Sequence, residues 1–194
     1  KKLREQMQIE LKHLHEKLGV TTVYVTHDQR EALTMSDRIA VINDGKLVQI
    51  DTPHNIYNHP ANAFVADFIG ESTILPLTRD NSGRLYFEDH LIESDLQTAV
   101  GSEWSLVIRP ERLTVLKSGE AVDSEQTMVF PGEVRDFVFQ GETAFALLSV
   151  GGRHLLSFRF ATDSQSQYNL QPGEQISLGL KRHDLIVIPR GDGQ

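Results

Sequence analysis

The hydrophobic pattern at the start of the chain changes from a helical period to a strand-like one. Apolar residues recur at spacings of three and four over residues 3–18, which predicts one apolar stripe on an α-helix that Gly19 ends. The β-branched and aromatic run at residues 21–26 predicts a short buried strand. A helix that leads directly into a strand favours an α/β unit with a parallel sheet. The stripe consists of Leu3, Met7, Leu11, Leu14 and Leu18.

A helix-start signal follows this strand. Asp28 and Glu31 have the spacing of a capping box, which predicts a short helix beginning after Asp28. His27 therefore lies at the turn between the expected strand and that helix. Ligands usually bind at such turns, at the edge of a sheet.

Turn chemistry also organises the next residues. The sequence Asn-Asp-Gly at residues 43–45 separates two apolar runs and predicts a β-hairpin, because these residue types tolerate positive φ. Thr52 and Pro53 have the pattern of an N-cap and first position of a brief helix. A second brief helix is expected to end at Gly70.

Beyond residue 70 the pattern consists of short alternating runs with frequent turns. It predicts a small barrel or sandwich of β-strands, with a domain boundary near residues 70–76. We therefore expect two domains, at residues 1–70 and 71–194. The expected strands of the second domain cover residues 85–87, 104–108, 113–116, 132–139, 143–150, 154–160, 175–180 and 185–188.

Composition narrows the functional classes. The 39% of hydrophobic residues supports folded cores, and no run approaches the roughly 20 apolar residues of a membrane-spanning helix. The charged first residues are unlike a signal peptide, so we expect a soluble, cytoplasmic chain. The absence of cysteine excludes disulfides and thiolate chemistry. The net charge of −8 disfavours a nucleic-acid partner.

A long motif carries a family resemblance. Residues 24–46 read YVTHDQREALTMSDRIAVINDGK and closely resemble the stretch of ABC ATPases from the switch histidine to the following hairpin. Residues 52–57 and 64–71 resemble the end of that domain in importers of the polyamine, iron and sugar type. The first helix and residues 68–71 are most similar to the polyamine (spermidine/putrescine) type.

The resemblance continues to the end of the chain. The segments VIRPE at residues 107–111, GEV at 132–134, FQG at 139–141 and QPGE at 171–174 resemble the regulatory TOBE domain of that family. The implied architecture is an α/β remnant of a P-loop ABC ATPase domain, followed by an all-β OB-like barrel. The implied function is the C-terminal portion of the ATP-hydrolysing subunit of an ABC importer, most similar to those for polyamines.

The resemblance also implies a role for His27. In the family, the matching histidine hydrogen-bonds the γ-phosphate of ATP and helps to hold the attacking water. An imidazole can donate toward developing phosphoryl charge, and positioning carries most of phosphoryl-transfer catalysis. A lone histidine more often satisfies a turn, but the surrounding motif favours the switch role. Asp28 and Glu31 are interpreted as structural, because capping explains their spacing.

Several family motifs are missing from the chain. Hydrolysis requires a Gly-x-x-x-x-Gly-Lys-Ser/Thr loop and a Walker-B acidic pair, and neither occurs in the sequence. The Leu-Ser-Gly-Gly-Gln signature is also absent. Gly45 and Lys46 are followed by Leu47 within the expected hairpin, so they cannot form the phosphate loop. The resemblance implies ATP and Mg²⁺ in the full-length subunit, whereas this chain alone is expected to be inactive and to bind neither tightly.

The implied partners follow from the same resemblance. They are a second ATPase subunit in a homodimer and transmembrane permease subunits, with the assembled protein peripheral on the inner face of the cell membrane. No metal site is expected, because His13 and His15 point to different faces of their helix and the other histidines are scattered.

Two further features of the β domain have competing interpretations. The Arg-Pro-Glu sequence at residues 109–111 could bind an effector anion, but an Arg-Glu pair at a strand end is usually a solvated turn. Aromatic residues could stack on nucleobases, but this half of the chain is acidic, so core packing is favoured. These aromatic residues are Trp104, Phe130, Phe137 and Phe139.

Two alternatives to an importer subunit stay open. In the first, the chain is a stand-alone TOBE-type module that binds a small molecule or a regulatory protein and lacks ATPase activity. In the second, it is an interaction protein, and another chain or a second copy covers the exposed edges of its incomplete sheet.

Overall fold

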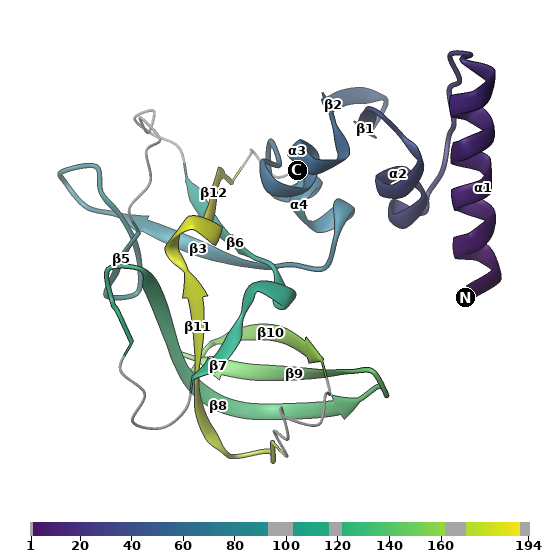
Figure 1. Cartoon of the computed structure of the whole chain (residues 1–194). Coiled ribbons are helices and arrows are strands. Elements are labelled where there is room, and N and C mark those ends of the chain that lie inside the picture. The colour runs from purple at the N-terminus through teal and green to yellow at the C-terminus, as the bar shows by residue number, and fades with distance from the viewer. Residues whose placement is uncertain (1, 93–102, 117–121, 162–169, 191–194) are drawn as a thin grey trace. The chain divides into compact units, whose positions relative to one another are not determined.

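The computed structural model describes residues 2–92, 103–116, 122–161 and 170–190. The chain divides into two compact units, Lys1–Gly70 and Glu71–Gln194 (Figure 1).

Over residues 2–70, the first unit combines four helices with one antiparallel hairpin. The turn of the hairpin has positive φ at Asp44 (48°) and Gly45 (73°), as its sequence predicts. The predicted caps are also present, since the Thr52 hydroxyl accepts from the Asn55 N–H at 3.3 Å at the start of α3. The elements are α1 (Lys2–Leu18), α2 (Gln29–Met35), β1 (Ile39–Asn43), β2 (Lys46–Asp51), α3 (Pro53–Asn58) and α4 (Ala63–Ile69).

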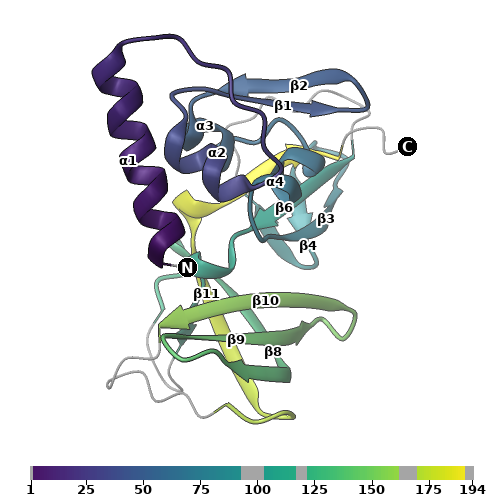
Figure 2. The same cartoon turned by 90° about the vertical axis from the view of Figure 1, so that its right-hand side faces the viewer.

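A small core holds the hairpin and the short helices together. Figure 2 shows the two strands of the hairpin side by side, with α3 next to them. Apolar side chains of the hairpin, α3 and α4 form one buried cluster, and Ala32 and Leu33 of α2 pack against it. The buried members are Ile39, Val41, Ile56, Val65 and Ile69.

The strand predicted at residues 21–26 does not form. These residues have no regular secondary structure, and Val23 and Val25 are 88% and 84% exposed. A strand is stable only when neighbouring strands satisfy its N–H and C=O groups. Among the described residues of this unit, the only paired strands are β1 and β2, and they pair antiparallel, so the predicted parallel sheet is also absent.

The first helix forms as predicted, but its apolar stripe is not buried. Of the stripe residues whose side chains the structure describes, each is at least half exposed: Met7, Leu11, Leu14 and Leu18. The unit therefore presents an unusual amount of apolar surface on α1 and on residues 21–26.

The described residues of the second unit form two five-stranded antiparallel sheets. Their strand orders are β10-β9-β8-β11-β7 and β12-β6-β3-β4-β5. Each predicted strand is present within a few residues, whereas β3 and β5 were not predicted. The strands are β3 (Thr73–Arg79), β4 (Leu85–Phe87), β5 (His90–Ile92), β6 (Trp104–Ile108), β7 (Thr114–Leu116), β8 (Thr127–Phe139), β9 (Thr143–Val150), β10 (His154–Ala161), β11 (Gln175–Lys181) and β12 (Ile186–Pro189).

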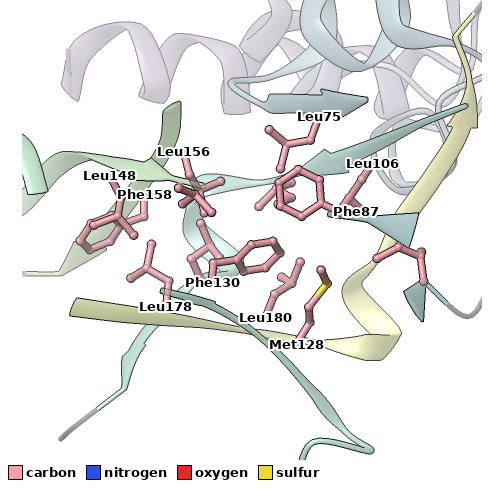
Figure 3. Packing of buried hydrophobic residues seen from close by; sticks show 14 of the residues in the cluster. Leu75, Phe87, Leu106, Met128, Phe130, Leu148, Leu156, Phe158, Leu178 and Leu180 are labelled. Atoms are coloured by element: carbon pink, nitrogen blue, oxygen red, sulfur yellow. The ribbon is translucent and has the colours of Figure 1, made fainter. Parts of the chain in front are cut away.

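Both sheets contribute to one hydrophobic core. Figure 3 shows side chains from the two sheets pointing toward one another, among them Phe87 of β4 and Phe130 and Phe158 of β8 and β10. The Phe87 and Phe130 rings lie 5.9 Å apart in a tilted arrangement. The prediction that the aromatic residues pack in the core is confirmed for Trp104 and Phe130, which are buried.

Phe139 contradicts the prediction of core packing. It lies at the end of β8, next to the turn into β9, and its side chain is 66% exposed. Phe137 is partly buried and stacks on Phe160, with the ring centroids 6.3 Å apart. Since residues 137 and 139 share one face of the strand, the core ends between them.

Candidate functional site

His27 lies in a bend immediately before α2, with its side chain exposed. Asp28 follows it as the N-cap of the helix. The Asp28 Oδ1 accepts from the N–H groups of Arg30 at 2.9 Å and Glu31 at 3.3 Å. The predicted capping role of Asp28 is therefore confirmed, and the cap sets where α2 begins.

The residues before and after His27 are joined by hydrogen bonds. The Thr26 hydroxyl oxygen accepts from the Asp28 N–H at 2.9 Å, which closes a turn around His27. The same hydroxyl donates to Glu31 Oε2 at 2.7 Å, and the Tyr24 hydroxyl donates to that oxygen at 2.9 Å. The capping-box spacing did not predict these contacts of Glu31, which link α2 to the segment that carries His27.

The surface beside His27 is a shallow, open depression lined by His27, Asp28, Gln29 and Arg30. An exposed imidazole at this position can donate a hydrogen bond to an oxygen of a phosphoryl group. It supplies one contact only, because the chain has no glycine-rich phosphate loop. By itself, this arrangement can position a phosphoryl oxygen but cannot cradle a nucleotide.

The structure corrects the interpretation of Arg109 as part of a solvated turn. Arg109 directly follows β6 and is 1% exposed, and its Nη1 donates to the Glu71 backbone carbonyl at 3.4 Å. Glu111, two residues later, lies in the short 3-10 helix Pro110–Arg112. Arginine buries its guanidinium only where acceptors are available, which the sequence motif alone does not reveal.

The described residues contain neither a cluster of metal-ligating side chains nor a membrane-spanning helix. No group of three or more His, Cys, Asp or Glu side chains among them is arranged to hold a metal ion. None of the helices in the described part of the chain is long and apolar enough to cross a membrane.

Comparison with known proteins places these features in a family. Residues 106–188 match the TOBE domain. The chain is 37% identical over 201 residues to the spermidine/putrescine import ATP-binding protein PotA of Nitratidesulfovibrio vulgaris, covering 98% of this chain and 54% of that protein. It is 41% identical over 198 residues to the protein of the same name from Rubrobacter xylanophilus, covering 96% of this chain and 50% of that protein.

A solved structure shows a more distant likeness. The cytoplasmic molybdate-binding protein ModG with molybdate bound is similar over 61% of this chain and 96% of that chain, with a TM-score of 0.45 and 16% sequence identity.

The sequence relationship covers nearly the whole chain, and the chain spans about half the length of the curated relatives that it matches. Its TOBE match falls within the second unit, where two antiparallel sheets enclose one core, as in an OB-like β domain. The chain therefore belongs to the family of ABC-importer ATP-binding subunits, as a C-terminal portion that includes the TOBE domain.

Proposed function

We propose that this chain is part of an ATP-hydrolysing subunit that powers the import of polyamines. The observation that carries the proposal is the similarity over nearly the whole chain to proteins named for spermidine/putrescine import and ATP binding. In this proposal, residues 1–70 are the C-terminal part of the nucleotide-binding domain, and residues 71–194 are a regulatory TOBE domain.

The exposed apolar surface of the first unit supports this assignment. The α1 stripe, with Leu11 and Leu14 about half exposed, and the β-branched residues Val23 and Val25 lack a covering layer within the described residues of the unit. Such surface is costly in water, so it favours a unit that belongs to a larger domain. In the proposed α/β domain, residues 21–26 pair as a strand with other strands, and the stripe faces that sheet.

His27 is the proposed contact to the nucleotide. Its exposed imidazole donates to the γ-phosphate of ATP and helps to hold the attacking water, while the phosphate loop and the Mg²⁺ ligands come from the rest of the subunit. The proposed assembly contains a second copy of the subunit, which completes the ATP sites, and permease subunits in the membrane. The subunit then lies at the cytoplasmic face of that membrane.

ATP hydrolysis by the complete subunit tests the role of His27. We expect His27→Ala to lower kcat by about 10-fold or more while ATP still binds, because only one transition-state contact is lost. His13→Ala is the matched control, since His13 is an exposed histidine on α1. Equal turnover by wild type and His27→Ala would reject the assignment. Uptake of labelled spermidine and putrescine by cells that carry the importer tests the substrate class separately.

The complete core of the β unit favours a second candidate function, binding of a small-molecule or protein effector. This unit has its own two-sheet core, so it can present a ligand surface without the first unit. Thermal unfolding with spermidine, putrescine or oxyanions separates the two candidates. A rise in Tm with one of these probes and none with ATP would favour the stand-alone binding module.

A further inference from the structure

The segment that carries His27 is held from both sides by the first turn of α2. On one side, the Asp28 side chain caps the helix through the N–H groups of Arg30 and Glu31. On the other side, the Thr26 hydroxyl donates to Glu31 Oε2 at 2.7 Å. The two neighbours of His27 are thus tied to the same helical turn, and to each other through the Asp28 N–H and Thr26 Oγ1.

These hydrogen bonds fix the backbone of His27 and leave its ring in solvent. A hydroxyl that accepts from the N–H two residues later restricts the backbone dihedrals of the residue between them. The Glu31 carboxylate, in turn, fixes the rotamer of Thr26 and takes a second hydrogen bond from the Tyr24 hydroxyl. Hydrogen bonds to an ionised carboxylate are among the stronger ones in proteins.

The stability of α2 does not explain why Glu31 is hydrogen-bonded to Thr26 and Tyr24. No residue of α2 is fully buried, and Tyr24 is 56% exposed, so the hydrogen bonds do not support a hydrophobic core at this place. The Asp28 side chain caps α2, whereas the Glu31 carboxylate accepts hydrogen bonds from the hydroxyls of Thr26 and Tyr24, which lie before the helix. What they determine is the conformation of the segment between Tyr24 and Asp28, which contains one candidate reactive group, His27.

We propose that Glu31, acting through Thr26, is a positioning residue that holds the His27 imidazole in the orientation needed to meet a phosphoryl oxygen. This inference rests on the proposed function, because it assigns a residue to the same site. A displacement of about 1 Å in a catalytic group can cost about 100-fold in rate, so a turn that removes backbone freedom at residue 27 has a direct effect on turnover.

Two variants test the proposal, with a conservative rescue and a matched control. Thr26→Val keeps the shape of the side chain and removes the hydroxyl, Glu31→Ala removes the acceptor, and Thr26→Ser restores the hydroxyl. Thr34→Val is the control, because Thr34 lies on the same helix and its hydroxyl donates to the backbone carbonyls of Arg30 and Glu31 rather than to the His27 segment. Turnover is measured in the complete subunit, and 15N relaxation at the His27 amide in the 194-residue chain.

We expect Thr26→Val and Glu31→Ala each to lower kcat by about 10-fold, with KM for ATP changed by less than about 2-fold. The His27 amide should become more mobile in both variants, and the double variant should lose little more than either single one. Thr26→Ser and Thr34→Val should remain close to wild type in both measurements.

The outcomes distinguish the proposed nucleotide contact of His27 from the proposed positioning role of Glu31. If His27→Ala lowers kcat while Thr26→Val and Glu31→Ala do not, the proposed function stands and the positioning role is wrong. If the His27 amide is equally rigid in wild type and both variants, the positioning role is also wrong, whatever the rates. If His27→Ala leaves kcat unchanged, the proposed site itself is rejected, and the positioning role falls with it.

Discussion

At the scale of single residues, backbone geometry restricts substitution at two glycines of the β8–β9 hairpin. Gly132 of β8 lies against β9, where an added Cβ would meet the Ser149 carbonyl oxygen and lie 2.9 Å from Leu148 Cγ. Gly141, in the turn between the same strands, has open space around it but a φ of +87°. The two glycines are therefore required for different reasons, one steric and one conformational.

This contrast leads to a stability prediction. Gly132→Ala should lower the free energy of unfolding of the β unit by about 2–3 kcal/mol, because the backbone carbonyl cannot move aside without breaking the β8–β9 pairing. Gly141→Ala, the matched control, should cost about 1 kcal/mol from its left-handed backbone alone. Urea unfolding of both variants measures the difference, and equal losses would contradict the steric argument.

Asp51 should make the stability of the first unit depend on pH. The Thr52 N–H and then the Asn55 side-chain amide donate to its carboxylate at 2.7 and 3.0 Å, and they hold the Asp51 pKa below its usual 3.8. A lowered pKa in the folded state stabilises the fold above pH 3.8, and this contribution is lost as the pH falls through the folded-state pKa.

The test compares wild type with Asp51→Asn. Between pH 6 and about pH 3, wild type should lose more stability than the variant, because the amide keeps the acceptor oxygen and removes the titration. Urea unfolding followed by amide signals of the β1–β2 hairpin reports on this unit. An identical pH dependence in the two proteins would show that Asp51 does not contribute.

Residue-level predictions succeeded where the cause is local. The Asp28 cap follows from its own spacing to the helix, and it is confirmed. Arg109 was expected in a solvated turn and is buried, since its environment depends on Glu71, which is distant in sequence. The contacts of Glu31 with Thr26 and Tyr24 were missed as well, although a hydroxyl residue next to His27 was a signal that could have suggested them.

At the scale of elements, local signals again separate the correct predictions from the wrong ones. The hairpin turn at residues 43–45, the Thr52 cap of α3 and the end of α4 at Gly70 depend on a few adjacent residues and are confirmed. The strand at residues 21–26 depends on partner strands that the described part of the first unit does not contain. β3 was missed because Pro76 lies inside it and the expected domain boundary reached that far.

A side-chain contact links the two sheets of the β unit. The Ser157 N–H of β10, an edge strand, donates to the Thr73 hydroxyl oxygen of β3 at 3.2 Å, and the Thr73 and Ser157 hydroxyls lie 3.1 Å apart. Thr73 thereby satisfies a backbone donor that the edge strand would otherwise present unpaired.

Removing this hydroxyl should weaken the junction between the sheets. Thr73→Val should cost about 1–2 kcal/mol, because it leaves the part-buried Ser157 N–H without its acceptor. Thr78→Val is the matched control, since Thr78 lies on the same strand and its hydroxyl donates to the Tyr86 carbonyl at 3.3 Å in an exposed bond. Hydrogen exchange at the Ser157 amide should accelerate in the first variant alone. Unchanged exchange there would contradict the proposed link.

At the scale of the whole chain, the two units differ in how much apolar surface they bury. Among the described residues, the core of the β unit contains nineteen buried side chains, whereas that of the first unit contains five. Of the large exposed apolar residues in the described part of the chain, fourteen belong to the first unit and three to the β unit. Burial of apolar surface is the main source of folding stability, so the β unit has the means to fold alone and the first unit has much less.

This difference predicts that the fragment 71–194 unfolds cooperatively in the absence of residues 1–70. Within the fragment, Phe130→Ala should cost about 3–5 kcal/mol, because the ring is fully buried between Phe87 and its neighbours and its loss leaves a cavity. Leu155→Ala, at an exposed position of β10, should change stability by less than about 0.5 kcal/mol. Thermal and urea unfolding of the three fragments provide the measurement. A gradual transition in the unsubstituted fragment would mean that the nineteen-residue core is insufficient by itself, and that the β unit depends on residues 1–70 for its stability.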